Sequence, residues 1–169
     1  MRRLILPGML LLLLCSCEIK VNTGGDSQPS AGGPRIRNGI ELTENGLHAS
    51  EAYLVYEDGS VVSNENKIDI NQKVQLRLLL TGWKERDGRV RPGAQEKITT
   101  SSGDLLLDSD DLFQSYSDGV SEADAAVLTV SAMITRLDKL YDYFLVRFRV
   151  WDKEDGGGEI TGSYKLYLR

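Results

Sequence analysis

The chain has 169 residues, of which 41% are hydrophobic and 27% are charged, and its formal net charge at pH 7 is −5. This balance is typical of a folded domain with its own core, and it argues against nucleic acid as a partner, because phosphate binding needs clustered positive charge. The two cysteines are Cys15 and Cys17, so the chain beyond them has no disulfide, no cysteine metal ligand and no thiol nucleophile.

The first residues are typical of a secretory signal. Met1-Arg2-Arg3 is basic, and residues 4–14 are an apolar run that is too short for a membrane-spanning helix, which needs about 20 residues. The run ends in Leu14-Cys15-Ser16-Cys17, which resembles the lipobox of bacterial lipoproteins, with a leucine three places before a cysteine and a small residue immediately before it. The resemblance implies that residues 1–16 are a signal peptide and that Cys17 becomes lipidated.

The lipobox pattern leaves two alternatives open. The sequence departs from the usual pattern at Cys15, where a small residue such as Ala or Ser is commoner. Cys15 is itself the competing lipidation site, but Leu14 would then lie beside the cleavage point, where the pattern requires a small residue. An ordinary secreted protein that is cleaved nearby is the alternative to a lipoprotein.

Residues 17–35 are predicted to be the lipidated N-terminus followed by a flexible tether. The segment is rich in Gly, Ser and Pro and has few apolar residues, so it cannot build a packed core. Glu18 stands where enterobacterial lipoproteins of the inner membrane have Asp. The resemblance therefore implies a lipid-anchored location in the cell envelope, at the outer membrane, and leaves open whether the domain faces the periplasm or the outside.

From residue 36 onward, most patterns are those of β-strands and turns. Alternation of apolar and polar side chains, which places one face of a strand on a core, is strongest at residues 73–81. We also expect strands at residues 36–42, 47–56, 95–100, 104–108 and 126–137.

Two short segments favour helix instead. Ser109 is a suitable N-cap for a helical turn over residues 109–116, and the acidic residues that follow it suit the positive end of a helix. Residues 121–125 are a second candidate for a single turn.

The clearest prediction is a β-hairpin at the C-terminal end of the chain. Residues 143–151 and 160–169 both alternate, and the acidic, glycine-rich segment 152–158 supplies turn residues between them. We expect Phe148 to lie opposite Tyr164, because this register pairs the apolar faces of the two strands.

The outward face of this hairpin is the candidate partner face. In the expected register Arg147 lies opposite Lys165, an unfavourable arrangement unless an acidic strand or an anionic partner neutralises the two charges. Mixtures of arginine and aromatic residues are typical of binding hot spots, although a solvated face is the simpler interpretation. The face comprises Arg147, Arg149, Trp151, Lys165 and Tyr167.

About seven to nine short strands linked by polar turns predict an all-β fold. We expect a single antiparallel β-sandwich over residues 36–169, with one or two short helical turns. Its architecture resembles that of immunoglobulin-like and C2-like sandwiches, without a motif that identifies either family. The sequence lacks a glycine-rich nucleotide loop and a βαβ rhythm, which disfavours nucleotide-binding folds.

The sequence offers little for catalysis, and we predict no catalytic residue. His48 is the only histidine, which excludes multi-histidine metal sites, and its surroundings do not resemble a nucleophile elbow. A carboxylate pair of the glycosidase type stays open among the 25 acidic residues, none of which stands out.

Two acidic loops are the candidate metal site. Ca²⁺ takes about 6–8 oxygen ligands, and carboxylates gathered in loops can supply them. The spacing does not match an EF-hand loop, and the simpler interpretation is a helix cap and a solvated hairpin tip. The candidate ligands are Asp108, Asp110, Asp111, Asp152 and Asp155.

Two functional hypotheses from different classes follow, and a purely structural envelope lipoprotein without a small ligand is a third alternative. The first is a lipid-anchored, non-catalytic binding or interaction module that needs no cofactor and holds an envelope protein or a glycan. The second is a calcium-assisted carbohydrate-binding module, or a hydrolase, that works through the acidic loops.

Overall fold

The computed structural model describes residues 35–135 and 137–169. The predicted signal peptide, the lipidation site Cys17 and all but the last residue of the tether lie outside the described residues. The elements are β1 (Arg35–Ile36), β2 (Glu41–Asn45), β3 (His48–Tyr56), β4 (Lys67–Ile68), β5 (Lys73–Thr81), β6 (Pro92–Thr100), β7 (Leu105–Asp108), α1 (Glu122–Ala125), β8 (Val127–Met133), β9 (Phe144–Asp152) and β10 (Glu159–Leu168).

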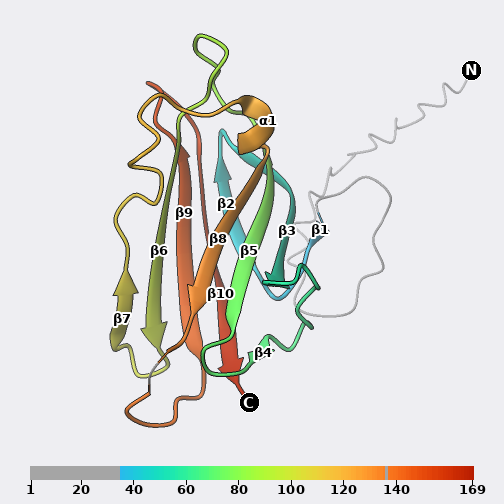
Figure 1. Cartoon of the computed structure of the whole chain (residues 1–169), viewed down its shortest axis with the longest axis vertical. Helices are drawn as coiled ribbons and strands as arrows, with labels where there is room; N and C mark the ends of the chain where they lie inside the picture. Colours follow the sequence, from blue (N-terminus) through green and yellow to red (C-terminus); the bar gives the residue numbers. More distant parts are fainter. Residues whose placement is uncertain (1–34, 136) are drawn as a thin grey trace, which may run out of the picture.

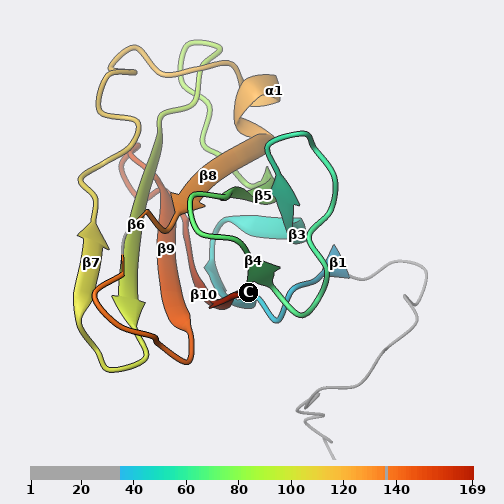
Figure 2. The same ribbon diagram turned by 60° about the horizontal axis from the view of Figure 1, so that its bottom comes forward.

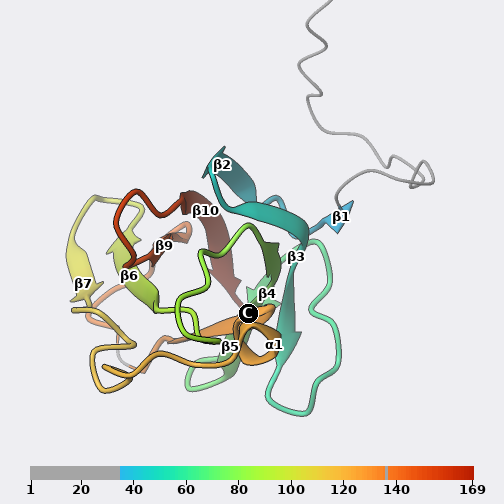
Figure 3. The same ribbon diagram turned by 90° about the horizontal axis from the view of Figure 1, so that it is seen from above.

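The strands form two sheets that pack face to face, so the predicted β-sandwich is confirmed (Figures 1 and 3). One sheet has four strands in the order β1-β3-β5-β8. The other has six: β2-β10-β9-β6-β7 in order, and β4, which pairs with β10 off this path. Most neighbours are antiparallel, as expected. Two short pairings are parallel: β1 with β3, and β4 with the C-terminal end of β10, beside which it lies in Figure 2.

The core lies between the two sheets and is built by the predicted alternation. Leu76 and Leu78 of β5 are fully buried, as are Phe144 and Val146 of β9. Each side chain of this size that leaves water stabilises the fold by about 1.5–3 kcal/mol. Because the other face of each strand points outward, the same alternation leaves the outer face of the six-stranded sheet free for polar residues.

The C-terminal hairpin is confirmed, but its register differs from the expected one by two residues. Phe148 lies opposite Gly162 rather than Tyr164, and Arg147 lies opposite Ser163 rather than Lys165. The turn is tighter than expected because the Asp152 N–H donates to the Gly158 carbonyl at 2.9 Å. The predicted clash of like charges between Arg147 and Lys165 therefore does not arise.

Two other expectations need correction. The expected strand at residues 36–42 is interrupted, because Asn38 and Gly39 both have positive φ and form a turn between β1 and β2. Residues 109–116 form turns rather than a helix, since the Ser109 hydroxyl accepts the Glu96 N–H of β6 and is not available as a helix cap. The other predicted turn of helix is α1, which Ser121 caps by accepting the Asp124 N–H.

A buried polar pair joins the first turn to the last strand. The amide nitrogen of Asn38 donates to Asn66 Oδ1 at 2.9 Å, and the Asn38 Oδ1 accepts the Leu54 N–H at 2.9 Å. Asn66 donates in turn to the carbonyl of Lys165 at 2.8 Å. This pair connects segments that are far apart in the sequence and fixes the position of β2 relative to β10.

In the described part of the chain, no helix is long and apolar enough to cross a membrane.

Candidate functional site

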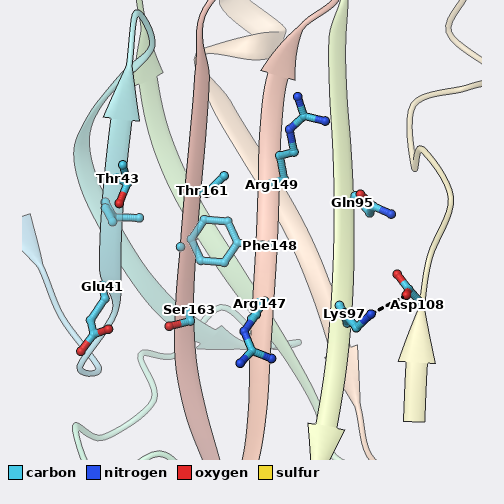
Figure 4. A pocket seen from close by; sticks show the side chains of 12 residues that line it. Glu41, Thr43, Gln95, Lys97, Asp108, Arg147, Phe148, Arg149, Thr161 and Ser163 are labelled. Atoms are coloured by element: carbon cyan, nitrogen blue, oxygen red, sulfur yellow. Dashed lines mark hydrogen bonds and ion pairs between the residues drawn. The ribbon is translucent and has the colours of Figure 1, made fainter. Parts of the chain in front are cut away.

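The outer face of the six-stranded sheet carries an open groove of about 580 Å³ (Figure 4). Its walls are side chains from β2, β10, β9, β6 and β7, so it crosses the whole sheet. Gly162 and the buried Phe148 complete its floor, where a Cβ on Gly162 would lie 2.5 Å from the Phe148 ring. The glycine therefore lets the ring pack directly beneath β10.

The strand register arranges the polar lining in two rows. Residues that lie opposite one another on neighbouring strands are about 4.8 Å apart, and successive outward positions along a strand are about 6.7 Å apart. The first row is Glu41, Ser163, Arg147, Lys97 and Asp108. The second row is Thr43, Thr161, Arg149 and Gln95.

Two of the three cations in the groove already have acidic partners. Lys97 Nζ donates to Asp108 Oδ2 at 2.8 Å (Figure 4). Arg149 donates to Glu159 Oε2 through Nε at 2.8 Å and through Nη2 at 2.7 Å. Such exposed pairs contribute only about 0–1 kcal/mol each, so they position the side chains more than they stabilise the fold.

Arg149 lies on the side of the groove that is nearest to Trp151. Its guanidinium carbon lies 4.8 Å from the centre of the Trp151 ring. The indole of Trp151 lies over Gly93 of β6, where any Cβ would overlap it. Glycine at this position thus makes room for a flat aromatic surface on the outer face of the sheet.

Arg147 differs from the other two cations. Its side chain is exposed in the middle of the first row, between Ser163 and Lys97 (Figure 4). Within residues 35–135 and 137–169, no carboxylate lies within ion-pair distance of it. The groove therefore has one cationic position that is open to a ligand.

The predicted partner face is present but divided in two. Arg147 and Arg149 line the groove, and Trp151 borders it. Lys165 and Tyr167 lie farther along β10 and gather around Tyr143, whose ring is 4.4 Å from Lys165 Nζ and packs edge-on against Tyr167 at 6.5 Å.

The structure does not bring the five candidate metal ligands together. In the described residues, no three acidic, histidine or cysteine side chains are placed to hold a metal ion. Asp108 pairs with Lys97, and Asp110 is exposed in the loop. Asp152 is buried and accepts the backbone N–H of Lys84 at 2.7 Å.

Asp111 and Asp155 also have structural neighbours. Burial opposes the charge of Asp111, but hydrogen bonds from Lys153 and from the N–H groups of Phe113 and Ala94 together hold its pKa below the usual range. The backbone carbonyl of Asp155 accepts Lys84 Nζ at 3.0 Å. Asp111 thus joins its loop to β6.

A buried acid lies on the inner face of the sheet behind the groove. Glu96 is only 2% exposed, and its burial raises its pKa to about 7. Tyr164 is 1% exposed, and both burial and the charge of Glu96 raise its pKa well above the usual range. In the described part of the chain, neither Glu96 Oε1 nor the Tyr164 hydroxyl has a hydrogen-bond partner.

Apart from Asp108, which was a candidate metal ligand, the groove residues outside the terminal hairpin were not predicted as a site. Gln95, Lys97, Glu41 and Thr43 belong to β6 and β2, which flank the hairpin only because of the strand order. Alternation does identify them as outward positions, but it does not say which strands are neighbours. His48, the residue weighed for catalysis, is exposed and lies 3.2 Å from Glu44.

Comparisons with known proteins show no family for this chain. No family model matches it, and no curated protein matches it. Among solved structures, it is similar to one described as "Crystal structure of the C-terminal domain of wzt", with 15% sequence identity, a TM-score of 0.42, and coverage of 80% of this chain and 81% of that one. The strand order itself makes the chain a β-sandwich, and a polar groove crosses one of its sheets.

Proposed function

We propose that the chain is a non-catalytic glycan-binding module held at the bacterial cell envelope by a lipid on Cys17. The observation that carries the proposal is the groove across the outer face of the six-stranded sheet. Four of its lining side chains, namely Thr43, Thr161, Ser163 and Gln95, are neutral hydrogen-bonding groups. Together with the cations, they match the many hydroxyl groups that a glycan presents.

The position of the groove favours a glycan over a peptide. Extended peptides commonly bind at the edge of a sheet, where free backbone groups form a new ladder with them. The groove instead crosses β10, β9 and β6, each of which is paired on both sides. Over these three strands a ligand in the groove meets side chains, and strand edges occur only at its two ends, on β2 and β7.

The spacing of the acids supports binding rather than hydrolysis. Glycosidases place two carboxyl groups about 5–10 Å apart. The two carboxylates of the groove, Glu41 and Asp108, lie on β2 and β7 at opposite ends of the first row. Four strand spacings separate them, which corresponds to about 19 Å. In addition, Asp108 is engaged by Lys97.

The role of the groove in glycan binding is tested by blocking the groove with a large side chain. Ser163→Trp places an indole in the first row, between Glu41 and Arg147, and Ser131→Trp makes the same change at an exposed position on the outer face of β8, in the other sheet. We expect the full-length wild-type protein to bind members of a panel of bacterial envelope polysaccharides. Ser163→Trp should abolish this binding, and Ser131→Trp should preserve it. Equal binding by the two variants would contradict the proposal.

The lipid anchor is tested separately. We expect metabolic labelling with a radioactive or clickable fatty acid to label the full-length protein and to locate it in the membrane fraction. Cys17→Ala should abolish the labelling, whereas Cys15→Ala should leave it intact. Labelling that survives Cys17→Ala, or a wild-type protein without label, would refute the anchor while leaving the groove unaffected.

A further inference from the structure

In the described part of the chain, one cation of the groove has no ion-pair partner. The three cations of the groove are Lys97, Arg147 and Arg149, and two of them are engaged by Asp108 and Glu159. The third has no ion pair in the part of the chain that the structure describes. Arginine presents a planar fork of donors that fits carboxylate and phosphate groups with two parallel hydrogen bonds.

We infer that the groove selects an acidic glycan, with Arg147 as the anchor for a carboxylate or phosphate group on it. This inference rests on the proposed function and adds the class of ligand. Ser163 lies directly opposite Arg147 and Lys97 lies on its other side, so a hydroxyl group and a second cation flank the anchor (Figure 4). An anion bound there would keep contact with the neutral residues of the second row.

The only acid of the groove without a cationic partner in the described residues stands apart from Arg147. Glu41 lies in the same row, but Ser163 is between them, and two strand spacings correspond to about 10 Å. At this distance in water, two unit charges interact weakly. Glu41 therefore does not neutralise Arg147, but it lowers the positive potential of the groove. Its removal should strengthen anion binding.

Aromatic surfaces on both sides extend the site along β9. Trp151 follows the two arginines along β9. Tyr143 precedes them and packs against Tyr167. The eight residue-to-residue steps from Tyr143 to Trp151 span about 26 Å at the rise of a strand. A chain of sugars laid along β9 would cross the groove at right angles to its two rows and pass over the cationic centre, with an aromatic ring near each end.

The test uses NMR titration of the full-length protein in detergent micelles with matched charged and neutral probes. The probes are a galacturonic acid trimer, its methyl ester, mannose 6-phosphate and mannose. We expect the acidic probes to shift the Arg147 side-chain N–H resonance and the Ser163 amide resonance, and we expect the neutral probes to bind at least tenfold more weakly. A response to only one acidic probe would identify the anionic group as carboxylate or as phosphate.

Three variants test, one at a time, the charge of Arg147, the planar fork of its guanidinium group, and the repulsion of a bound anion by Glu41. Arg147→Gln should weaken binding of the acidic probe about tenfold or more, because it removes a charge-assisted hydrogen bond. Arg147→Lys should retain part of the affinity, since it keeps the charge but loses the fork. Glu41→Gln should strengthen binding about twofold by removing a repulsive charge about 10 Å away. Lys73→Gln, a change at a cation on β5 of the other sheet, is the control and should change the affinity by less than about twofold.

The outcomes distinguish this inference from the proposed function. If acid and methyl ester shift the groove resonances equally and Arg147→Gln binds like the wild type, the glycan site stands and its selectivity for acidic ligands is refuted. If no acidic probe shifts the Arg147 resonance, the anchor is likewise refuted. If both the polysaccharide panel and all four probes leave the groove unchanged, the proposed function fails and this inference fails with it.

Discussion

Replacing the buried Glu96 by glutamine should make the protein more stable at pH 8 and remove much of its dependence on pH. Glu96 lies on the inner face of β6, is 2% exposed, and has a pKa raised by burial from 4.5 to about 7. The unfolded chain exposes the same group to water, where its ordinary pKa applies. The folded state therefore holds this proton more tightly than the unfolded state does.

The sign and size of the effect follow from proton linkage. A raised pKa in the folded state means that the contribution of Glu96 to stability is complete below pH 4.5 and is lost as the pH rises toward 7. Each pKa unit corresponds to about 1.4 kcal/mol, so the rise from 4.5 to about 7 implies a loss of about 3 kcal/mol. Glu96→Gln keeps the size of the side chain and removes the ionisation.

Urea unfolding at pH values between 4 and 8, followed by circular dichroism, tests this reasoning. We expect the wild type to lose about 3 kcal/mol across this range through Glu96, and we expect Glu96→Gln to be more stable than the wild type by a similar amount at pH 8. Glu85→Gln, a change at an exposed carboxylate, is the control and should retain the wild-type slope. The stability of Glu96→Gln could instead fall with pH as steeply as that of the wild type. This result would refute the reasoning that ionisation of the buried Glu96 destabilises the fold.

Three further predictions concern the packing and the loops. Asn38→Ala should destabilise the fold by about 3 kcal/mol in urea unfolding, because it leaves the buried Leu54 N–H without a partner and places alanine at a φ of 58°; a loss below about 1 kcal/mol would contradict the structural role of the amide. Gly162→Ala should cost about 1–3 kcal/mol, since the new Cβ would lie 2.5 Å from Phe148, and an unchanged melting temperature would show that the ring does not pack there. Calcium up to millimolar concentration should leave the melting temperature of the EDTA-treated protein unchanged, because the candidate aspartates do not converge on one position; a saturable rise would restore the calcium hypothesis.

Alternation and turn residues were sufficient to predict most of the fold. They placed the apolar faces of β5 and β9 on the core, and they located the terminal hairpin almost to the residue. They did not fix the hairpin register, because register depends on how tightly the turn closes. The bond from the Asp152 N–H to the Gly158 carbonyl shortens the loop, and Gly162 makes room for the Phe148 ring.

As a partner face, the sequence predicted only those residues of the candidate site that lie on the terminal hairpin. Arg147 and Arg149 were identified as members of an outward face, but Glu41 and Lys97 come from strands that join the hairpin through non-local pairing. Ser109 shows a second limit of local patterns. Its hydroxyl is a good helix cap in isolation, yet it accepts the backbone N–H of Glu96 because the loop runs beside β6.

The place of β10 in the sheet has a consequence for the order in which the protein can fold. β10 follows all the other described strands in chain order, yet it pairs with β2, β9 and β4, and its Lys165 carbonyl accepts a hydrogen bond from Asn66, 99 residues earlier. Until residues 159–168 emerge, β2 and β9 have no strand between them and the sandwich stays open on one side. A chain that ends before residue 159 therefore lacks a strand that this sheet needs, and the fold reaches its full stability only once residues 159–168 are present.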